Sequence, residues 1–117
     1  MAEFKLLSRL TDDNTELVME MHRDGQAVGH LQVTPAEVEI LIRHLSDQRE
    51  KMNEEVPRDL DVGTRLVCTK EPIFRVEADP DGVILALRHP GIGWLGFLLS
   101  PPLAAVLAVR LGLQRTS

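Results

Sequence analysis

The feature that most constrains this chain is an internal repeat. Residues 17–45 can be laid on residues 83–111 with a constant offset of 66, although only four of these 29 positions are identical. Both segments carry the same order of landmarks: apolar strand, glycine, apolar strand, hydroxyl residue, proline and apolar helix. With this offset, Gly25 aligns with Gly91, and Thr34-Pro35 aligns with Ser100-Pro101. This order predicts two copies of one supersecondary unit.

Each copy is expected to hold three strands followed by a helix. In the first, the pattern predicts strands near 4–10, 16–22 and 27–33 and a helix from Pro35. In the second, it predicts strands near 72–78, 83–88 and 93–99 and a helix from Pro101, with an additional strand over 64–70. Extended backwards, the repeat places Arg9-Leu10 on Arg75-Val76 and Asp13 on Asp79.

These elements indicate an α+β fold. We expect duplicated β-β-β-α units with pseudo-two-fold symmetry, forming antiparallel sheet with two packed helices. Residues 1–117 would be a single domain with repeat units 4–45 and 72–111 and a linker over 54–64.

Side-chain alternation fixes the expected hairpin registers. In the first hairpin Leu17 should face Val33 and Met19 should face Leu31. A two-residue turn at Asp24-Gly25 would pair Met19 with His30 and break the apolar face. We therefore expect odd-length loops centred on Gly25 and Gly91, with these glycines at positive φ. The second hairpin should pair Val83 with Leu99, Leu85 with Phe97, and Leu87 with Leu95.

The opposite faces of the two hairpins differ in polarity. The first is mixed, with Val18, Glu20, His22, Val28, His30 and Gln32, whereas the second is mostly apolar, with Ile84, Ala86, Arg88, Trp94, Gly96 and Leu98. Strands that are apolar on both faces are usually covered on both. Trp94, Arg88, Ile84 and Leu98 are therefore the candidate interface, with a cation–π contact expected between Arg88 and Trp94. The linker is the alternative cover for this face.

The two helices show the same asymmetry. Thr34 and Glu37 form a capping box at the start of the first helix. Its apolar stripe is formed by Val38, Leu41, Ile42 and Leu45. The second helix has no charged residue before Arg110 and would need neighbours on more than one side.

Candidate catalytic, metal and cofactor residues all have ordinary explanations. Glu20, His22 and His30 could approach one another, but no metal-binding spacing supports a site. Cys68 alternates with Leu66 in the expected strand and should be an inert inward thiol. The GxGxxG string at 91–96 lies in a hairpin rather than before a helix. We assign no catalytic residue, metal or cofactor and expect a protein that is not an enzyme.

Charge and cysteine content limit the partners and the compartment. The net charge of −5 makes duplex nucleic acid unlikely to be the main partner. One cysteine and the lack of a signal-like start at 1–5 favour the cytoplasm. Residues 90–109 carry no formal charge, but Pro101 and Pro102 interrupt them, so no membrane span is expected.

The repeated sheet-then-helix topology resembles the PUR and Whirly class of single-stranded nucleic-acid binders. This resemblance is one of topology and implies single-stranded nucleic acid as a partner. The chain departs from that class because it is acidic, has no Lys/Arg cluster and has few aromatic residues. We expect a small non-catalytic homodimeric interaction or adaptor protein. The alternatives are the nucleic-acid binder, or a small-ligand-binding protein or enzyme without a recognisable motif.

Overall fold

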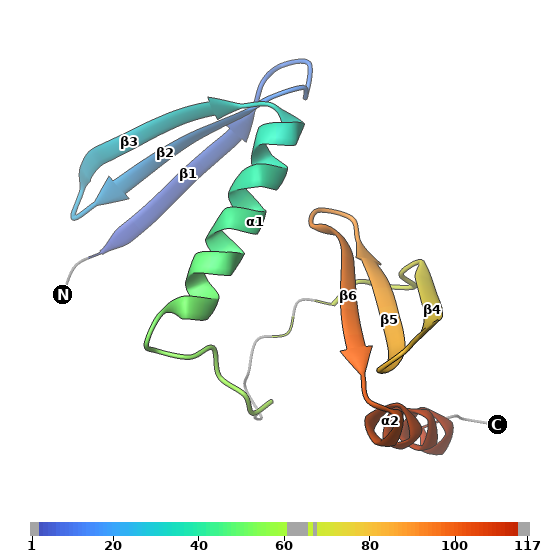
Figure 1. The fold of residues 1–117 in the computed structure, drawn as a ribbon. Helices are drawn as coiled ribbons and strands as arrows, with labels where there is room; N and C mark the ends of the chain where they lie inside the picture. The colour runs from blue at the N-terminus through green and yellow to red at the C-terminus, as the bar shows by residue number, and fades with distance from the viewer. Residues whose placement is uncertain (1–2, 61–65, 67, 115–117) are drawn as a thin grey trace. The chain divides into compact units, whose positions relative to one another are not determined.

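The computed structural model describes residues 3–60, 66 and 68–114 and confirms the duplicated β-β-β-α arrangement (Figure 1). The chain divides into two units, Met1–Asp61 and Val62–Ser117. Each unit holds a three-stranded antiparallel sheet, in the order β1-β2-β3 or β4-β5-β6, and each sheet is followed by a helix. The elements are β1 (Phe4–Leu10), β2 (Leu17–Arg23), β3 (Gln26–Val33), α1 (Pro35–Lys51), β4 (Phe74–Asp79), β5 (Gly82–His89), β6 (Gly93–Leu99) and α2 (Pro101–Leu113).

The first hairpin reaches the expected register by an unexpected route. Leu17 pairs with Val33 and Met19 with Leu31, as predicted. However, the turn has two residues, Asp24 and Gly25, both at positive φ. A β-bulge at Met21/His22 restores the register by leaving one extra residue on β3. The expected odd-length loop is therefore wrong here, because the bulge supplies the extra residue inside the strand.

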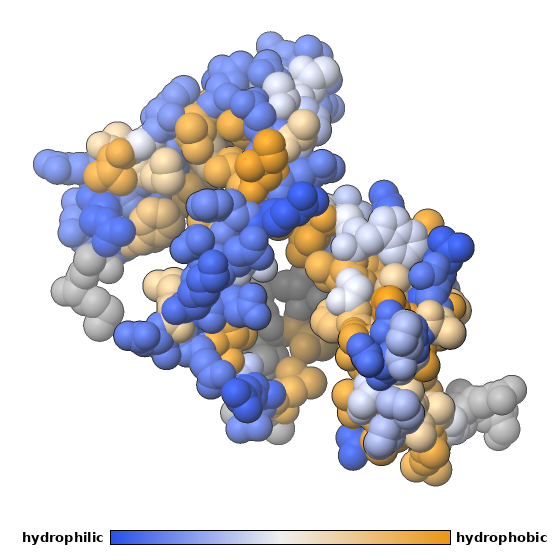
Figure 2. Space-filling view, in the orientation of Figure 1, coloured by the Kyte–Doolittle hydropathy of each residue, from blue (hydrophilic) through white to orange (hydrophobic). Residues whose placement is uncertain are grey.

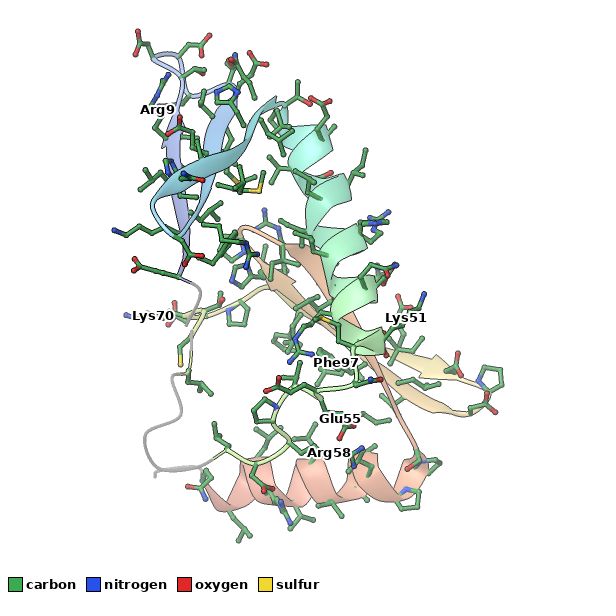
Figure 3. The ribbon with its side chains drawn as sticks, turned by 90° about the vertical axis from the view of Figure 1, so that its left-hand side faces the viewer. Arg9, Lys51, Glu55, Arg58, Lys70 and Phe97 are labelled. Atoms are coloured by element: carbon green, nitrogen blue, oxygen red, sulfur yellow. The ribbon has the colours of Figure 1, made fainter. Side chains whose placement is uncertain are left out.

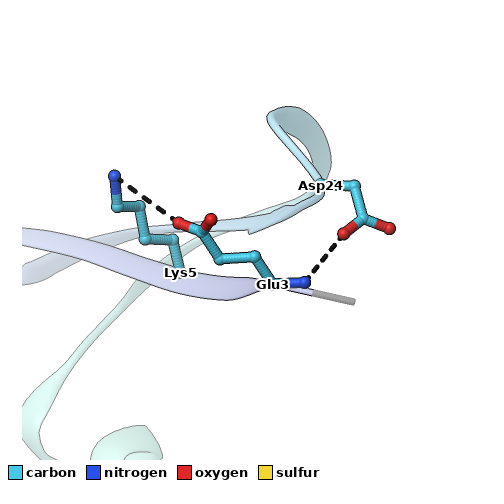
Figure 4. A network of polar contacts seen from close by, with 3 residues as sticks. All are labelled: Glu3, Lys5 and Asp24. Carbon is cyan, nitrogen blue, oxygen red and sulfur yellow. Dashed lines mark hydrogen bonds and ion pairs between the residues drawn. The ribbon is translucent and has the colours of Figure 1, made fainter. Parts of the chain in front are cut away.

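The turn of this hairpin is tied to the start of β1 (Figure 4). The backbone N–H of Glu3 donates to Oδ1 of Asp24 over 2.7 Å, and the Asp24 N–H donates to the Glu3 carbonyl over 2.8 Å. The Glu3 carboxylate lies 3.9 Å from Nζ of Lys5, at the exposed surface. These contacts hold the free end of β1 beside the β2–β3 turn.

The second hairpin has the expected odd-length loop. His89 pairs with Gly93 across three loop residues, and the pairs Val83–Leu99, Leu85–Phe97 and Leu87–Leu95 all form as predicted. The glycine with positive φ is Gly93, at 95°, and not Gly91. Nδ1 of His89 instead holds the loop by accepting the backbone N–H groups of Gly91 at 3.0 Å and Ile92 at 3.1 Å.

The units differ most in the connection after their first strand. Thr11–Glu16 forms a six-residue loop between β1 and β2, whereas β4 turns into β5 through two residues between Asp79 and Gly82. Leu10 pairs with Leu17, and Ala78 pairs with Val83. Leu10 therefore corresponds to Ala78, and its sequence alignment on Val76 is wrong because the two loops differ in length.

The segment between the units contains a second correction. Residues 52–60 lie outside helices and strands, with the exposed Arg58 guanidinium 2.8 Å from the Glu55 carboxylate (Figure 3). The strand expected over 64–70 is absent at 66 and 68–70, and its other positions lie outside the described residues. Cys68 is exposed and not inward-facing, since the described residues around it, 66 and 68–70, form no strand.

Both helices begin where the sequence places them. The Glu37 N–H donates to the Thr34 hydroxyl over 3.3 Å, and the Thr34 N–H donates to the Glu37 carboxylate over 3.0 Å, which completes the capping box. The hydrogen bond from the Thr34 backbone N–H is the main cause of the lowered pKa of the Glu37 carboxyl. Ser100 caps α2 by accepting the Leu103 N–H. Within the described ranges, neither helix combines the length and apolarity that crossing a bilayer requires.

Very little of either unit is buried. Among the described residues, Val33 is the one buried hydrophobic residue, with 6% of its surface exposed. α1 contacts its own sheet through β3, and α2 contacts its sheet through β5 and β6. Neither helix has a buried residue. Hydrophobic residues consequently reach the surface on both units (Figure 2). Each sheet therefore has an apolar face that its own helix covers only in part.

The capping box gives a direct test of the start of α1. Replacing Thr34 with Ala should lower the free energy of unfolding by roughly 1 kcal/mol, because the Glu37 N–H loses its acceptor. Urea unfolding followed by circular dichroism measures this loss. Thr34→Ser keeps the hydroxyl and should stay near wild type, whereas equal stability of the Ala variant would contradict the cap.

The turn into β5 requires a glycine at position 82. Gly82 has φ of 150°, and a Cβ there would overlap the carbonyl oxygen of Leu99. Gly82→Ala should therefore cost roughly 1–3 kcal/mol in thermal or urea unfolding. Gly112, with no heavy atom near its Cβ position, provides the matched control. Gly112→Ala should not destabilise the protein, and an unchanged Gly82→Ala variant would contradict the described close approach.

The loop between β1 and β2 gives a pH-dependent prediction. Hydrogen bonds from the Thr15 hydroxyl, the Thr11 hydroxyl and the Thr15 N–H to Asp13 lower the pKa of its carboxyl from 3.8 to about 2. Since the folded pKa is below the unfolded one, this stabilisation is present above about pH 4 and is lost as the pH falls towards 2.

An NMR titration of the Asp13 side-chain carboxyl measures this pKa directly. Thr15→Val removes the strongest donor and should move the midpoint back towards 3.8. A wild-type midpoint already near 3.8 would show that the loop does not hold the carboxylate as described.

Candidate interface on the second unit

The four candidate interface residues lie on one face of the second sheet. Arg88 pairs directly with Trp94, and Ile84 pairs directly with Leu98, so that β5 and β6 each contribute two of them. Alternation along both strands places them on the same side, with Ala86 and Gly96 between them. We call this side the Trp94 face; it is completed on β4 by Arg75 and Glu77.

The Trp94 face is largely open. Trp94 is 54% exposed and Leu98 55%, while Ile84 on the central strand is half-buried. Arg88 is exposed, and within the described residues the cation–π contact found is between Arg23 and Phe4, not between Arg88 and Trp94. The expected Arg88–Trp94 contact is therefore absent, and the indole presents its surface without a cation over it.

Charge is distributed unevenly across this face. On β4 the guanidinium Nε of Arg75 lies 3.0 Å from a carboxylate oxygen of Glu77, and both side chains are exposed. β5 contributes one charge, Arg88, and β6 contributes none. Polarity thus falls from the β4 edge to the β6 edge, which resembles the rim and the centre of a protein–protein interface.

The opposite face of the sheet forms an apolar groove with α2. Its volume is about 480 Å³. It is lined by Phe74, Val76, Val83, Leu85, Leu87, Leu99, Ala104, Leu107, Ala108 and Leu111. All of these side chains are apolar, so the groove offers no acid, base or nucleophile for catalysis. It could hold apolar groups but provides no polar atom to orient them.

The sequence did not predict that this groove would stay open. It grouped Leu85 and Phe97 on one apolar face of a sheet that was expected to be covered on both faces. Phe97 (labelled in Figure 3) is instead 50% exposed, and Phe74 is 66% exposed. The reason lies in α2, which contacts the sheet through β5 and β6. The small side chains of Ala104 and Ala108 leave space on the side of the helix that faces the sheet.

The outer side of α2 is also apolar and exposed. Leu103, Val106, Val109 and Leu113 all expose large fractions of their surface. This confirms that the helix has no polar side before Arg110. The second unit therefore presents apolar surface on both faces of its sheet and on the outside of its helix.

The first unit carries the more polar candidate site. The mixed face of its sheet has a shallow depression of about 260 Å³, lined by Leu7, Ser8, Arg9, Val18, Glu20 and His30. Glu20 pairs with His30 as expected, and Nε2 of His22 lies 3.4 Å from the Glu20 carboxylate. Within the described residues, no three histidine, cysteine or acidic side chains are placed to hold a metal ion. Ser8 is the hydroxyl residue in this lining, and alternation along β1 assigns Ser8 to the opposite face of the sheet, where it pairs with Met19.

Comparisons with known proteins give no assignment. Neither a family model, nor a curated protein, nor a solved structure matches this chain.

Proposed function

We propose that this protein is a small non-catalytic interaction protein that assembles as a homodimer through its second unit. The main support for this proposal is that the second sheet is mostly apolar on both faces, while one helix covers only part of one of them. Large exposed apolar patches are uncommon on monomeric proteins and mark sites of association.

The exposure of individual apolar side chains supports association. On the Trp94 face, Trp94 and Leu98 are each more than half exposed, and on the outside of α2 Leu103 and Val109 are also more than half exposed. Covering such side chains with a second chain removes apolar surface from water, which is the main favourable contribution to protein association.

A second copy of the chain is the partner that this surface favours. The centre of the Trp94 face, at Ile84, Gly96 and Leu98, is uncharged and so does not repel an identical copy. The charges near it are the Arg75–Glu77 pair on β4 and Arg88 beside Trp94. Symmetric association covers the same patch on both copies at once. Single-stranded nucleic acid would instead require several basic side chains and stacking aromatics. The Trp94 face supplies one tryptophan and two exposed arginines, of which Arg75 is paired with Glu77.

Replacing Trp94 with Asp tests the assignment. A buried carboxylate at the centre of the interface would be desolvated without a partner, so the variant should shift from dimer to monomer. Sedimentation velocity over a range of protein concentrations measures the assembly, and circular dichroism confirms the fold of the variant.

Ile40 on α1 provides the matched control, because it is 65% exposed and lies outside the second unit. Ile40→Asp should remain dimeric. A wild-type protein that is a stable folded monomer at micromolar concentration would refute the homodimer, and salt-dependent binding of a single-stranded oligonucleotide by that monomer would favour the nucleic-acid alternative.

A further inference from the structure

The four edge strands of the two sheets differ in how they resist pairing with another strand. β1 carries Lys5 and Arg9, and β4 carries Arg75, Glu77 and Asp79. β3 has no such charge but contains the β-bulge. Charges and bulges are the usual devices that keep an edge strand from pairing with other chains. Among the described edge strands, β6 alone has neither a charge, nor a proline, nor a bulge.

The backbone groups on the free side of β6 can be identified from the register. The Arg88 N–H donates to the Ile73 carbonyl over 2.9 Å, so the backbone groups of Arg88 point towards the β4 side. Hydrogen-bonded and non-hydrogen-bonded pairs alternate in antiparallel sheets. Arg88–Trp94 is therefore a non-hydrogen-bonded pair of β5 and β6. It follows that the N–H and C=O groups of Trp94, Gly96 and Leu98 point outward from the edge.

These outward groups are symmetric about Gly96. We propose that β6 pairs antiparallel with β6 of a second copy, with Gly96 opposite Gly96 on the two-fold axis. Trp94 then lies opposite Leu98 of the second copy, and the two sheets join into one of six strands. The inference rests on the proposed homodimer and specifies contact along the β6 edge. This contact places the two Trp94 faces side by side on one side of the joined sheet, so that Trp94 and Leu98 are covered where the two edges meet.

The side chains on both faces suit this pairing. On the Trp94 face, a large indole lies beside a leucine of the other copy, and the glycine between them leaves room for both. On the opposite face, Leu95 comes opposite Phe97 of the second copy, so two half-exposed apolar residues cover each other. The charged strand β4 stays at the outer edges of the joined sheet, where its ion pair remains in water.

A cysteine at position 96 tests the register. A Cβ on Gly96 comes no nearer than 4.0 Å to another heavy atom, the Ile84 methyl carbon, so the substitution fits the monomer. Directly opposite residues of a hydrogen-bonded pair have Cα atoms about 5.5 Å apart, within the range of a disulfide. In a Cys68→Ser background, Gly96→Cys should form a covalent dimer on mild oxidation, as seen by non-reducing electrophoresis.

Ala78 on β4 is the matched control for this experiment. It belongs to a non-hydrogen-bonded pair with Val83, so its backbone groups also point outward, but from the charged edge. Ala78→Cys in the same background should stay uncrosslinked. Equal crosslinking of both variants, or none at position 96, would overturn the register.

Proline at position 96 tests the backbone pairing itself. Gly96→Pro removes the N–H that faces the second copy but none that bonds to β5, and an outward-facing edge position tolerates proline. The dimer dissociation constant in sedimentation should rise roughly 10- to 100-fold, as expected for two lost backbone hydrogen bonds. Ala78→Pro removes an outward N–H from β4 and should leave the dissociation constant unchanged.

The outcomes separate this inference from the proposed function. If Trp94→Asp gives monomers while Gly96→Pro stays fully dimeric and Gly96→Cys does not crosslink, the edge pairing is wrong and the homodimer stands. If the wild-type chain is monomeric, both fail. Crosslinking at position 96 but not at 78, together with weakened assembly of Gly96→Pro, establishes the pairing.

Discussion

The register between neighbouring strands is the constraint on which the rest of this structure depends. Pairing Met19 with Leu31 and Leu85 with Phe97 decides which side chains share a face of each sheet. A shift by one residue would exchange the two faces along the whole strand. In the first unit the two-residue turn alone would shift the pairing of β2 with β3 by one residue. A bulge inside β3 corrects this shift, so that the apolar register is kept. The apolar face is therefore conserved between the units although their turns differ.

Much of the fold could be predicted because its signals are local. Strand alternation, the Thr34 and Ser100 caps and the prolines that follow them fix the elements and most cross-strand pairs. The bulge could not be predicted, since a loop of odd length and a tight turn with an extra strand residue give the same alternation. The alignment of Leu10 failed for a similar reason: loop length changes without changing the pattern of the strands it joins.

The candidate interface was predictable only in part. The grouping of Trp94, Arg88, Ile84 and Leu98 follows from alternation and register alone. The groove on the other face depends on how closely α2 approaches the sheet. The residues of α2 that line it, Ala104, Leu107, Ala108 and Leu111, stand at the repeat positions of the apolar stripe of α1. In α2 two of these four residues are alanines, whereas α1 has Val38 and Ile42 at the same positions. The spacing of apolar residues does not show how much space the small alanine side chains leave between helix and sheet.

The hairpin connections have a consequence for how the chain acquires its structure. Every strand in both sheets pairs with a strand adjacent in sequence, across loops of two to six residues. Short loops cost little entropy to close, and proteins dominated by such local contacts cross their folding barrier quickly. Each sheet can therefore form before any distant segment arrives. Covering the apolar faces is the step left over, and when it involves two molecules its rate depends on protein concentration.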